Sequence, residues 1–163
     1  MRRTYLLWVT AAIGLAVDQS TKAIAAVVVE GREPTHAFGG AVTFAAFRNS
    51  GAAGSFAPRA TLVFTLLACA VLVFIARVAP AVRSPGWAVG LGLLFAGAGG
   101  NLADRIFRTP GFGRGAVLDF IRIGDSGTFN LADQCVTLGA LLIIVQTFRG
   151  IPMRAGAPLP SHS

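Results

Sequence analysis

Histidine and cysteine are nearly absent from this chain of 163 residues, which holds only two of each. One histidine, His162, lies in a tail that contains Pro and Ser, so a His-based catalytic triad or a zinc site has little to draw on. Cys69 and Cys135 both fall inside apolar runs, and we interpret them as packing residues rather than as a disulfide or metal ligands. A phosphate loop of the P-loop pattern is also missing. The sequence therefore predicts a function without metal or other cofactor.

Charge is scarce as well. Only 13% of the residues are charged and 54% are hydrophobic, and the mean hydropathy is +0.67, so a water-soluble domain is disfavoured. The formal net charge of +7 could suggest a nucleic-acid partner. However, the basic residues are scattered among connecting segments instead of forming one patch, which argues against nucleic acid as a partner.

Long apolar runs dominate what is present. A membrane-spanning helix needs roughly 20 mainly apolar residues, and four runs qualify: 5–29, 60–79, 86–107 and 129–148. The first run follows two arginines, as in a cleavable signal peptide, but its apolar pattern resumes after Lys22, so we expect it to stay and span. The predicted fold is an all-α integral membrane protein, one four-helix transmembrane domain over residues 1–150 with a disordered cytoplasmic tail at 151–163.

The connecting segments add detail to this fold. Residues 41–47 alternate loosely in hydropathy, which predicts a strand within a small extracytoplasmic β element at 30–59. Residues 108–128 contain one proline and several glycines and are predicted to be an outer loop. The third run is rich in glycine, which lets membrane helices approach closely, so we expect it at the centre of the bundle.

Four spans put both termini on the same side of the membrane. Arg2 and Arg3 beside the first run favour the cytoplasm for the N-terminus. The segments expected on that side carry arginines and no acids, but each of the two opposite loops also holds three arginines. The count of basic residues therefore discriminates weakly.

Several ionisable residues fall at membrane depth, where each costs about 2.5 to 3.5 kcal/mol on insertion scales and so requires a reason. Asp18 and Lys22 are four residues apart and share one helix face, as a structural ion pair would. Asn101 shares a face with Asp104 and Arg105 at the end of the third run. That group could equally be an interfacial pair in which Arg105 reaches the lipid headgroups.

Two further acids flank the start of the fourth run. Asp119 precedes it, and Asp133 lies about one turn inside it, three residues after Asn130. If the two carboxylates converge, one keeps a proton while the other activates water, as in aspartic proteases. The alternative is a loop acid and a separate acid that interacts with a helix dipole. For a lone pair of aspartates this alternative is ordinarily the better interpretation, and composition and spacing alone do not overturn it.

Five motifs in order resemble those of the signal peptidase II family, also called the lipoprotein signal peptidases. They are Asp-Gln-Ser-Thr-Lys at 18–22, Asn-Ser-Gly-Ala-Ala at 49–53, Gly97 to Arg105, Val-Leu-Asp-Phe at 117–120 and Phe-Asn-Leu-Ala-Asp at 129–133. Against this family the chain departs at Gly54, where many members have an aromatic residue, and at Ala96, where glycine is frequent. The resemblance covers nearly the whole chain.

The resemblance implies an intramembrane aspartyl endopeptidase that cuts prolipoproteins before a diacylglyceryl-modified cysteine, with Asp119 and Asp133 as the catalytic pair. It also implies substrate-binding or site-supporting roles for a further set of residues, namely Asn49, Gly97, Asn101, Arg105, Asn130, Asp18 and Lys22. The β element would be the family's cradle on the membrane surface. The implied partners are prolipoproteins, membrane lipid and the antibiotic globomycin. The implied location is the bacterial inner membrane, with both termini cytoplasmic and the site toward the outer face.

Two other classes of function stay open from the residues alone. A small transporter or proton-conducting protein would use the charged residues of the spans as a polar path. A non-catalytic assembly protein would use the glycine-rich run for helix contacts, and it predicts that both aspartates can be replaced by asparagine without loss of function.

Overall fold

The computed structural model describes residues 3–51 and 57–154, so the expectations for Gly54 and for residues 155–163 lie outside the described residues. Within this part of the chain it has four long helices: α1 (Thr4–Val28), α2 (Ala57–Val78), α3 (Pro85–Phe107) and α4 (Leu131–Phe148). All four contain windows long and apolar enough to cross a membrane. The predicted fold of four transmembrane helices with a small β element is confirmed.

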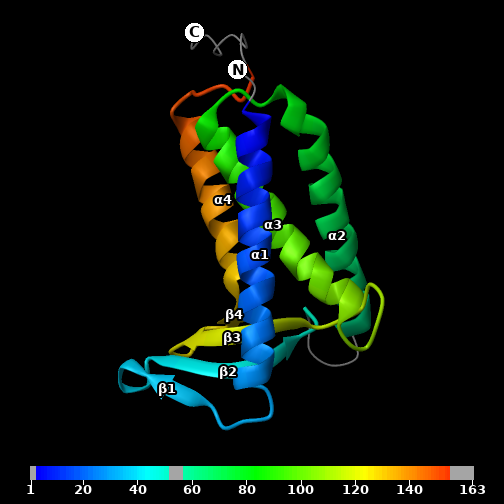
Figure 1. The fold of residues 1–163 in the computed structure, drawn as a ribbon, viewed down its shortest axis with the longest axis vertical. Coiled ribbons are helices and arrows are strands. Elements are labelled where there is room, and N and C mark those ends of the chain that lie inside the picture. Colours follow the sequence, from blue (N-terminus) through cyan, green and yellow to red (C-terminus); the bar gives the residue numbers. More distant parts are fainter. Residues whose placement is uncertain (1–2, 52–56, 155–163) are drawn as a thin grey trace.

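Helix α3 occupies the centre of the bundle and packs on the other three helices (Figure 1). Its glycines make this possible. A methyl group on Gly92 would come within 2.6 Å of the Leu7 carbonyl oxygen of α1, and one on Gly97 would come within 2.6 Å of Val136 Cγ2 on α4. Small residues thus let α3 approach both neighbours closely, as expected for packing inside a bilayer.

Ala96 also belongs to this packing. It is buried, and its methyl group lies opposite Gly14 of α1, where a side chain would come within 2.7 Å of it. The departure from the family's frequent glycine at 96 is therefore accommodated by a glycine on the facing helix.

A four-stranded antiparallel sheet lies at one end of the helices, in the order β1 (Thr35–Ala37), β2 (Val42–Asn49), β3 (Val117–Ile123) and β4 (Thr128–Phe129). Strand β2 agrees with the strand expected at 41–47. The hairpin between β1 and β2 turns at Gly39 and Gly40, whose φ angles of 66° and 94° are left-handed and favour glycine.

The prediction of a plain outer loop at 108–128 is wrong, because this segment contains β3 and the first residue of β4. Strand β3 pairs with β2 over nearly its whole length, with Phe47 opposite Asp119 and a bulge between Phe44 and Phe47. Pairing with a strand some 70 residues earlier in the chain supplies the hydrogen bonds that make this segment a strand, and no local pattern records that partner.

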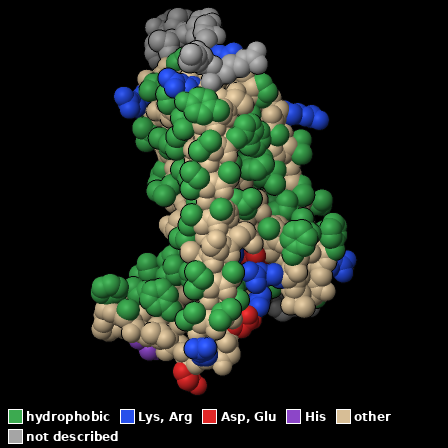
Figure 2. Space-filling view, viewed as in Figure 1, with side chains coloured by type: hydrophobic (Ala, Val, Ile, Leu, Met, Phe, Trp, Pro, Cys, Tyr) green, Lys and Arg blue, Asp and Glu red, His purple; other side chains and the backbone are tan. Residues whose placement is uncertain are grey.

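Both described ends of the chain lie at the end of the bundle opposite the sheet (Figure 1). Hydrophobic side chains cover the middle of the face seen in Figure 2, and the charged side chains gather toward its two ends. Residues 151–154, where we expected a disordered tail to begin, are tied to the start of α3: Trp87 Nε1 donates to the Ile151 carbonyl at 2.8 Å and the Arg83 amide to that of Met153 at 2.9 Å.

Candidate active site

Asp119 lies on β3 with 1% of its side chain exposed. Its carboxylate accepts three hydrogen bonds: Asn130 Nδ2 donates to Oδ1 at 2.7 Å, and Asn49 Nδ2 and Thr128 Oγ1 donate to Oδ2 at 2.9 and 3.2 Å. Burial raises the pKa of Asp119 above its ordinary value, and the negative charge of Asp133 adds to the rise. The three hydrogen bonds oppose this rise only in part.

Asp133 stands in the first turn of α4 and caps it reciprocally with Asn130. The Asn130 amide donates to Asp133 Oδ2 at 3.0 Å, and the Asp133 amide donates to Asn130 Oδ1 at 3.2 Å. This capping box satisfies backbone donors that a helix start leaves free. The other oxygen, Oδ1, accepts from Asn101 Nδ2 of α3 at 2.9 Å.

Asn130 therefore contacts both aspartates at once, through its side chain to Asp119 and through its backbone to Asp133. The two carboxylates, whose convergence the sequence left open, thus share Asn130 as a hydrogen-bond partner. The four elements β2, β3, α3 and α4 each contribute one polar residue to this centre, respectively Asn49, Asp119, Asn101 and Asp133.

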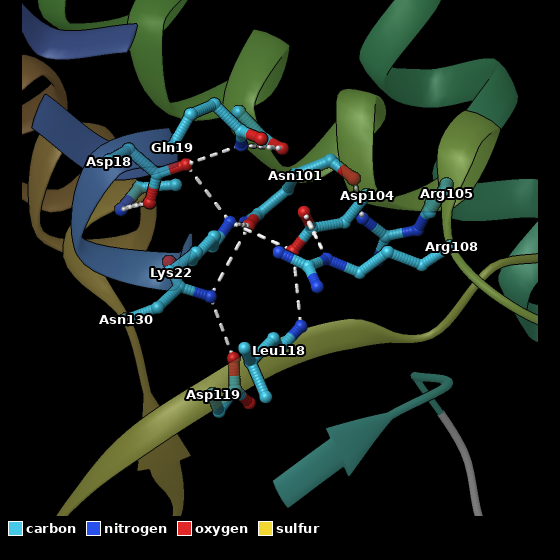
Figure 3. Close-up of polar contacts among 12 residues, drawn as sticks. Asp18, Gln19, Lys22, Asn101, Asp104, Arg105, Arg108, Leu118, Asp119 and Asn130 are labelled. Atoms are coloured by element: carbon cyan, nitrogen blue, oxygen red, sulfur yellow. Dashed lines mark hydrogen bonds and ion pairs between the residues drawn. The ribbon is translucent and has the colours of Figure 1, made fainter. Parts of the chain in front are cut away.

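A second polar cluster adjoins this centre and is linked to it through Asn101 (Figure 3). Lys22 of α1 is fully buried and forms ion pairs with Asp18 at 3.0 Å and with Asp104 at 3.1 Å. Its Nζ also donates to Asn101 Oδ1 at 3.0 Å. Removing one partner from such a buried group of charges typically costs about 3–5 kcal/mol, because an uncompensated charge is left behind.

The carboxylates of Asp18 and Asp104 also accept hydrogen bonds from outside this cluster. Asp18 Oδ1 accepts from the Ala132 amide at 2.9 Å. Asp104 accepts from the Leu118 amide at 3.1 Å and from Arg108 Nε at 2.8 Å. The spacing of Asp18 and Lys22 predicts their ion pair. The contacts of the two carboxylates with backbone amides of distant segments are additional.

Arg105 is buried, with only 9% of it exposed, whereas an arginine that reaches lipid headgroups would be exposed. One guanidinium nitrogen donates to the backbone carbonyl oxygen of Asn101 at 3.2 Å, and the guanidinium group lies 5.8 Å from the ring centre of Phe64. Its Nε has no hydrogen-bond partner among the described residues. A buried donor without a partner is costly and is unusual in a folded protein.

A cavity of about 540 Å³ lies between α2, α3 and α4. One end of it is lined by Asn101, Arg105 and Asp133. The rest of its wall is apolar apart from one threonine and consists of Phe64, Leu67, Ala68, Val71, Leu94, Ala98, Val136 and Thr137. The site thus combines a polar end, where a peptide bond could be held beside a carboxylate, with an apolar groove that leads away from it.

The remaining candidate residue, Gly97, lies at the α3–α4 contact: a methyl group there would strike the Ala132 carbonyl oxygen. It lets α3 and α4 approach closely and is not among the residues that line the cavity. Two contacts of the site were not predicted from the sequence. They are the hydrogen bond of Thr128 to Asp119 and that of the Leu118 amide in β3 to Asp104. Among the described residues no group of three or more His, Cys, Asp or Glu side chains could hold a metal ion.

The fold and the site define a polytopic membrane protein in which a buried carboxylate, Asp119, and a half-buried one, Asp133, lie beside an apolar groove. The sequence model of the family described as Signal peptidase (SPase) II matches residues 10–149, so the chain belongs to the signal peptidase II family. It is accordingly a peptidase and a multi-pass protein of the bacterial inner membrane.

Individual relatives agree with this assignment. The chain is 44% identical over 150 residues to the lipoprotein signal peptidase of Streptomyces coelicolor, covering 92% of this chain and 74% of that protein. It is 45% identical over 149 residues to the lipoprotein signal peptidase of Mycobacterium avium, covering 91% and 82%. A solved bacterial membrane enzyme structure superposes with a TM-score of 0.73 at 26% identity, covering 92% of each chain.

Proposed function

We propose that this member of the signal peptidase II family is an aspartyl endopeptidase that removes the signal peptide from prolipoproteins, with Asp119 and Asp133 as its catalytic pair. The bond cut is the one before the diacylglyceryl-modified cysteine. The observation that carries the proposal is the contact of Asn130 with both carboxylates, at 2.7 Å from its side chain to Asp119 and 3.0 Å from its amide to Asp133. Relatives named lipoprotein signal peptidases supply the substrate class.

The different surroundings of the two carboxylates assign them different roles in acid–base catalysis. Asp119 is more deeply buried than Asp133, and burial raises its pKa, so it holds the proton that the pair shares. Asp133 lines the cavity and is the carboxylate that a substrate-side water would meet. Asp133 therefore acts as the general base, and Asp119 as the acid that polarises the scissile carbonyl.

In the proposed reaction each carboxyl group gives up or accepts one proton in each of two steps. Water attacks the carbonyl carbon and gives a proton to Asp133, while Asp119 gives its proton to the carbonyl oxygen. The tetrahedral intermediate then collapses, the C–N bond breaks, and the leaving amine takes the proton from Asp133 as Asp119 recovers its own. Each carboxyl ends in its starting state, so no metal and no covalent enzyme intermediate is required.

The apolar groove is the proposed site for the signal peptide. Leu67, Val71 and Leu94 lead away from Asp133 along the helices, so an apolar segment can lie there while its end reaches the carboxylates. Arg105 lines the polar end, and its guanidinium group suits a substrate backbone carbonyl. The diacylglyceryl chains stay in the surrounding hydrocarbon, which explains why such an enzyme is built at the membrane.

We further propose that both termini are cytoplasmic and that the sheet and the carboxylates lie at the outer face. The end of the bundle that carries the termini has arginines, among them Arg77, Arg83 and Arg149, and its segments at 79–84 and 149–154 contain no acid. This distribution follows the tendency of basic residues to remain in the cytoplasm.

Cleavage of a diacylglyceryl-modified prolipoprotein by the purified protein in detergent, followed by gel shift, tests the function. Wild type should cleave and should be blocked by globomycin, and Asp119→Asn and Asp133→Asn should each lose cleavage while remaining folded. Asp125→Asn is the matched control, because Asp125 is an exposed acid in the turn after β3. Cleavage that persists in either variant of the pair would remove that aspartate from the mechanism.

A further inference from the structure

The residue that precedes each proposed catalytic aspartate donates its backbone amide to a buried carboxylate on α1 or α3. The Leu118 amide, which precedes Asp119, donates to Asp104 Oδ2 at 3.1 Å. The Ala132 amide, which precedes Asp133, donates to Asp18 Oδ1 at 2.9 Å. Two acids from α1 and α3 thus fix the backbone at the same position relative to each member of the pair.

Lys22 joins these two acids. Its Nζ lies 3.0 Å from Asp18 Oδ2 and 3.1 Å from Asp104 Oδ2, and all three side chains are at most 1% exposed (Figure 3). Its third contact, at 3.0 Å, is with Asn101 Oδ1, whose amide nitrogen donates to Asp133. A continuous chain of contacts therefore runs from Leu118 through Asp104, Lys22 and Asp18 to Ala132.

We propose that Asp18, Lys22 and Asp104 form a positioning bracket that sets the separation of the two catalytic carboxylates. In this arrangement Asp104 and Lys22 are positioning residues for the cleavage step and do not touch the substrate. The inference rests on the proposed function, since it concerns how Asp119 and Asp133 are held for that reaction.

The need for such a bracket follows from the fold. Asp119 belongs to a strand and Asp133 to a helix, so no single element fixes the distance between them. A misplacement of about 1 Å in an active site can cost about 100-fold in rate. Asn130 bridges the two side chains, whereas the bracket fixes the two backbones from which these side chains extend.

The energetics favour a positional role over a purely stabilising one. Burying charges is costly, and replacing a buried ion cluster by apolar residues is often neutral or stabilising. Here the cluster is fully buried and is also tied to two backbone amides of the site. Apolar packing could fill the same volume but could not hold those amides.

Gly100 offers a mild way to disturb the bracket. A methyl group on Gly100 would collide with Asp18 Oδ2, come within 3.0 Å of its Cγ and lie 3.3 Å from Ala132 Cβ, so the contact between Asp18 and the Ala132 segment must shift. Gly99, the preceding residue on α3, is the matched control: a methyl group there meets only Leu15 and Leu72, at 3.8 and 3.9 Å. Both substitutions add one methyl group to the same helix.

The experiment measures kcat and KM for cleavage of a diacylglyceryl-modified prolipoprotein by wild type, Gly100→Ala and Gly99→Ala in detergent, with thermal unfolding to confirm folding. We expect kcat to fall about 100-fold in Gly100→Ala, with KM within about twofold of wild type, because the misplaced carboxylates act only in the chemical step. Gly99→Ala should resemble wild type. A folded Gly100→Ala variant with kcat equal to that of Gly99→Ala, or with its loss confined to KM, would overturn the bracket.

A second variant keeps the test decisive if Gly100→Ala does not fold. Asp104→Asn keeps an oxygen for the Leu118 amide but loses the charge that binds Lys22. Its kcat should fall at least about tenfold at unchanged KM, and wild-type kcat in the folded variant would refute the role of Asp104. Failure of the wild-type protein to cleave would count against the proposed function instead, so the two failures are distinguishable.

Discussion

Asn130 donates its side-chain amide to Asp119 at 2.7 Å, and this contact joins the strand that carries one carboxylate to the helix that carries the other. The same residue caps α4 by accepting from the Asp133 amide at 3.2 Å. Asn130 thus has two separable tasks, one in the stability of α4 and one in the geometry of the pair.

Serine and alanine at 130 should separate these tasks. Asn130→Ser keeps an oxygen that can cap the helix and Asn130→Ala does not, so the free energy of unfolding of the serine variant should exceed that of the alanine variant by about 1 kcal/mol. Both lose the donor to Asp119, and we expect cleavage to fall by about 10- to 100-fold in both. Thermal unfolding and cleavage rates measure the two effects, and wild-type cleavage by Asn130→Ser would show that the contact with Asp119 is dispensable.

The capping box shows what the sequence could predict. Asn130 and Asp133 are three residues apart at the start of an apolar run, and this local spacing is sufficient to place them on one helix face. The pair Asp18 and Lys22 is local in the same way. The four spans were also predictable, because the length and apolarity of a membrane helix are properties of a single segment.

The contacts that sequence reasoning missed all join distant segments. Strand β3 depends on pairing with β2, and Asp104 reaches the Leu118 amide only because β3 returns beside the end of α3. Thr128 donates to Asp119 across the turn between β3 and β4, which we had interpreted as loop. None of these contacts leaves a periodic pattern in the sequence, so the three-dimensional arrangement is needed to find them.

The raised pKa of Asp119 predicts how stability depends on pH. Because burial raises this pKa, the folded protein binds the proton more tightly than the unfolded chain does. Stability contributed by the protonated carboxyl is therefore complete below the ordinary Asp pKa of about 3.9 and is lost as pH rises through the raised value. Asp119→Asn cannot ionise and should gain stability relative to wild type over that window.

Thermal unfolding of wild type, Asp119→Asn and Asp125→Asn in detergent across acidic to neutral pH checks this expectation. The difference in melting temperature between Asp119→Asn and wild type should grow with pH and then level off. Asp125→Asn, which alters an exposed acid, serves as the reference for a general charge effect. A constant difference at every pH would mean that the pKa of Asp119 is not raised by folding.

Arg105 should act in substrate binding rather than in the chemical step. Its Nε lies buried at the polar end of the groove without a partner among the described residues, and a lysine there would keep the charge but not the planar fork of donors. Arg105→Lys is expected to raise KM by about tenfold with a smaller change in kcat. Steady-state kinetics over a range of prolipoprotein concentrations measures this, and a loss confined to kcat would assign Arg105 to the transition state instead.

The groove itself can be tested by filling it. Ala68 lines the apolar wall on α2, so a tryptophan there should occupy the space that we assign to the signal peptide. Ala70, on the same helix, is exposed and does not line the cavity, which makes Ala70→Trp a control for the added bulk. We expect Ala68→Trp to raise KM by about tenfold or more and to leave the melting temperature close to that of Ala70→Trp. Because Asp119 and Asp133 are untouched, kcat at saturating prolipoprotein should be retained. Equal KM values for the two tryptophan variants would mean that the signal peptide binds elsewhere on the bundle.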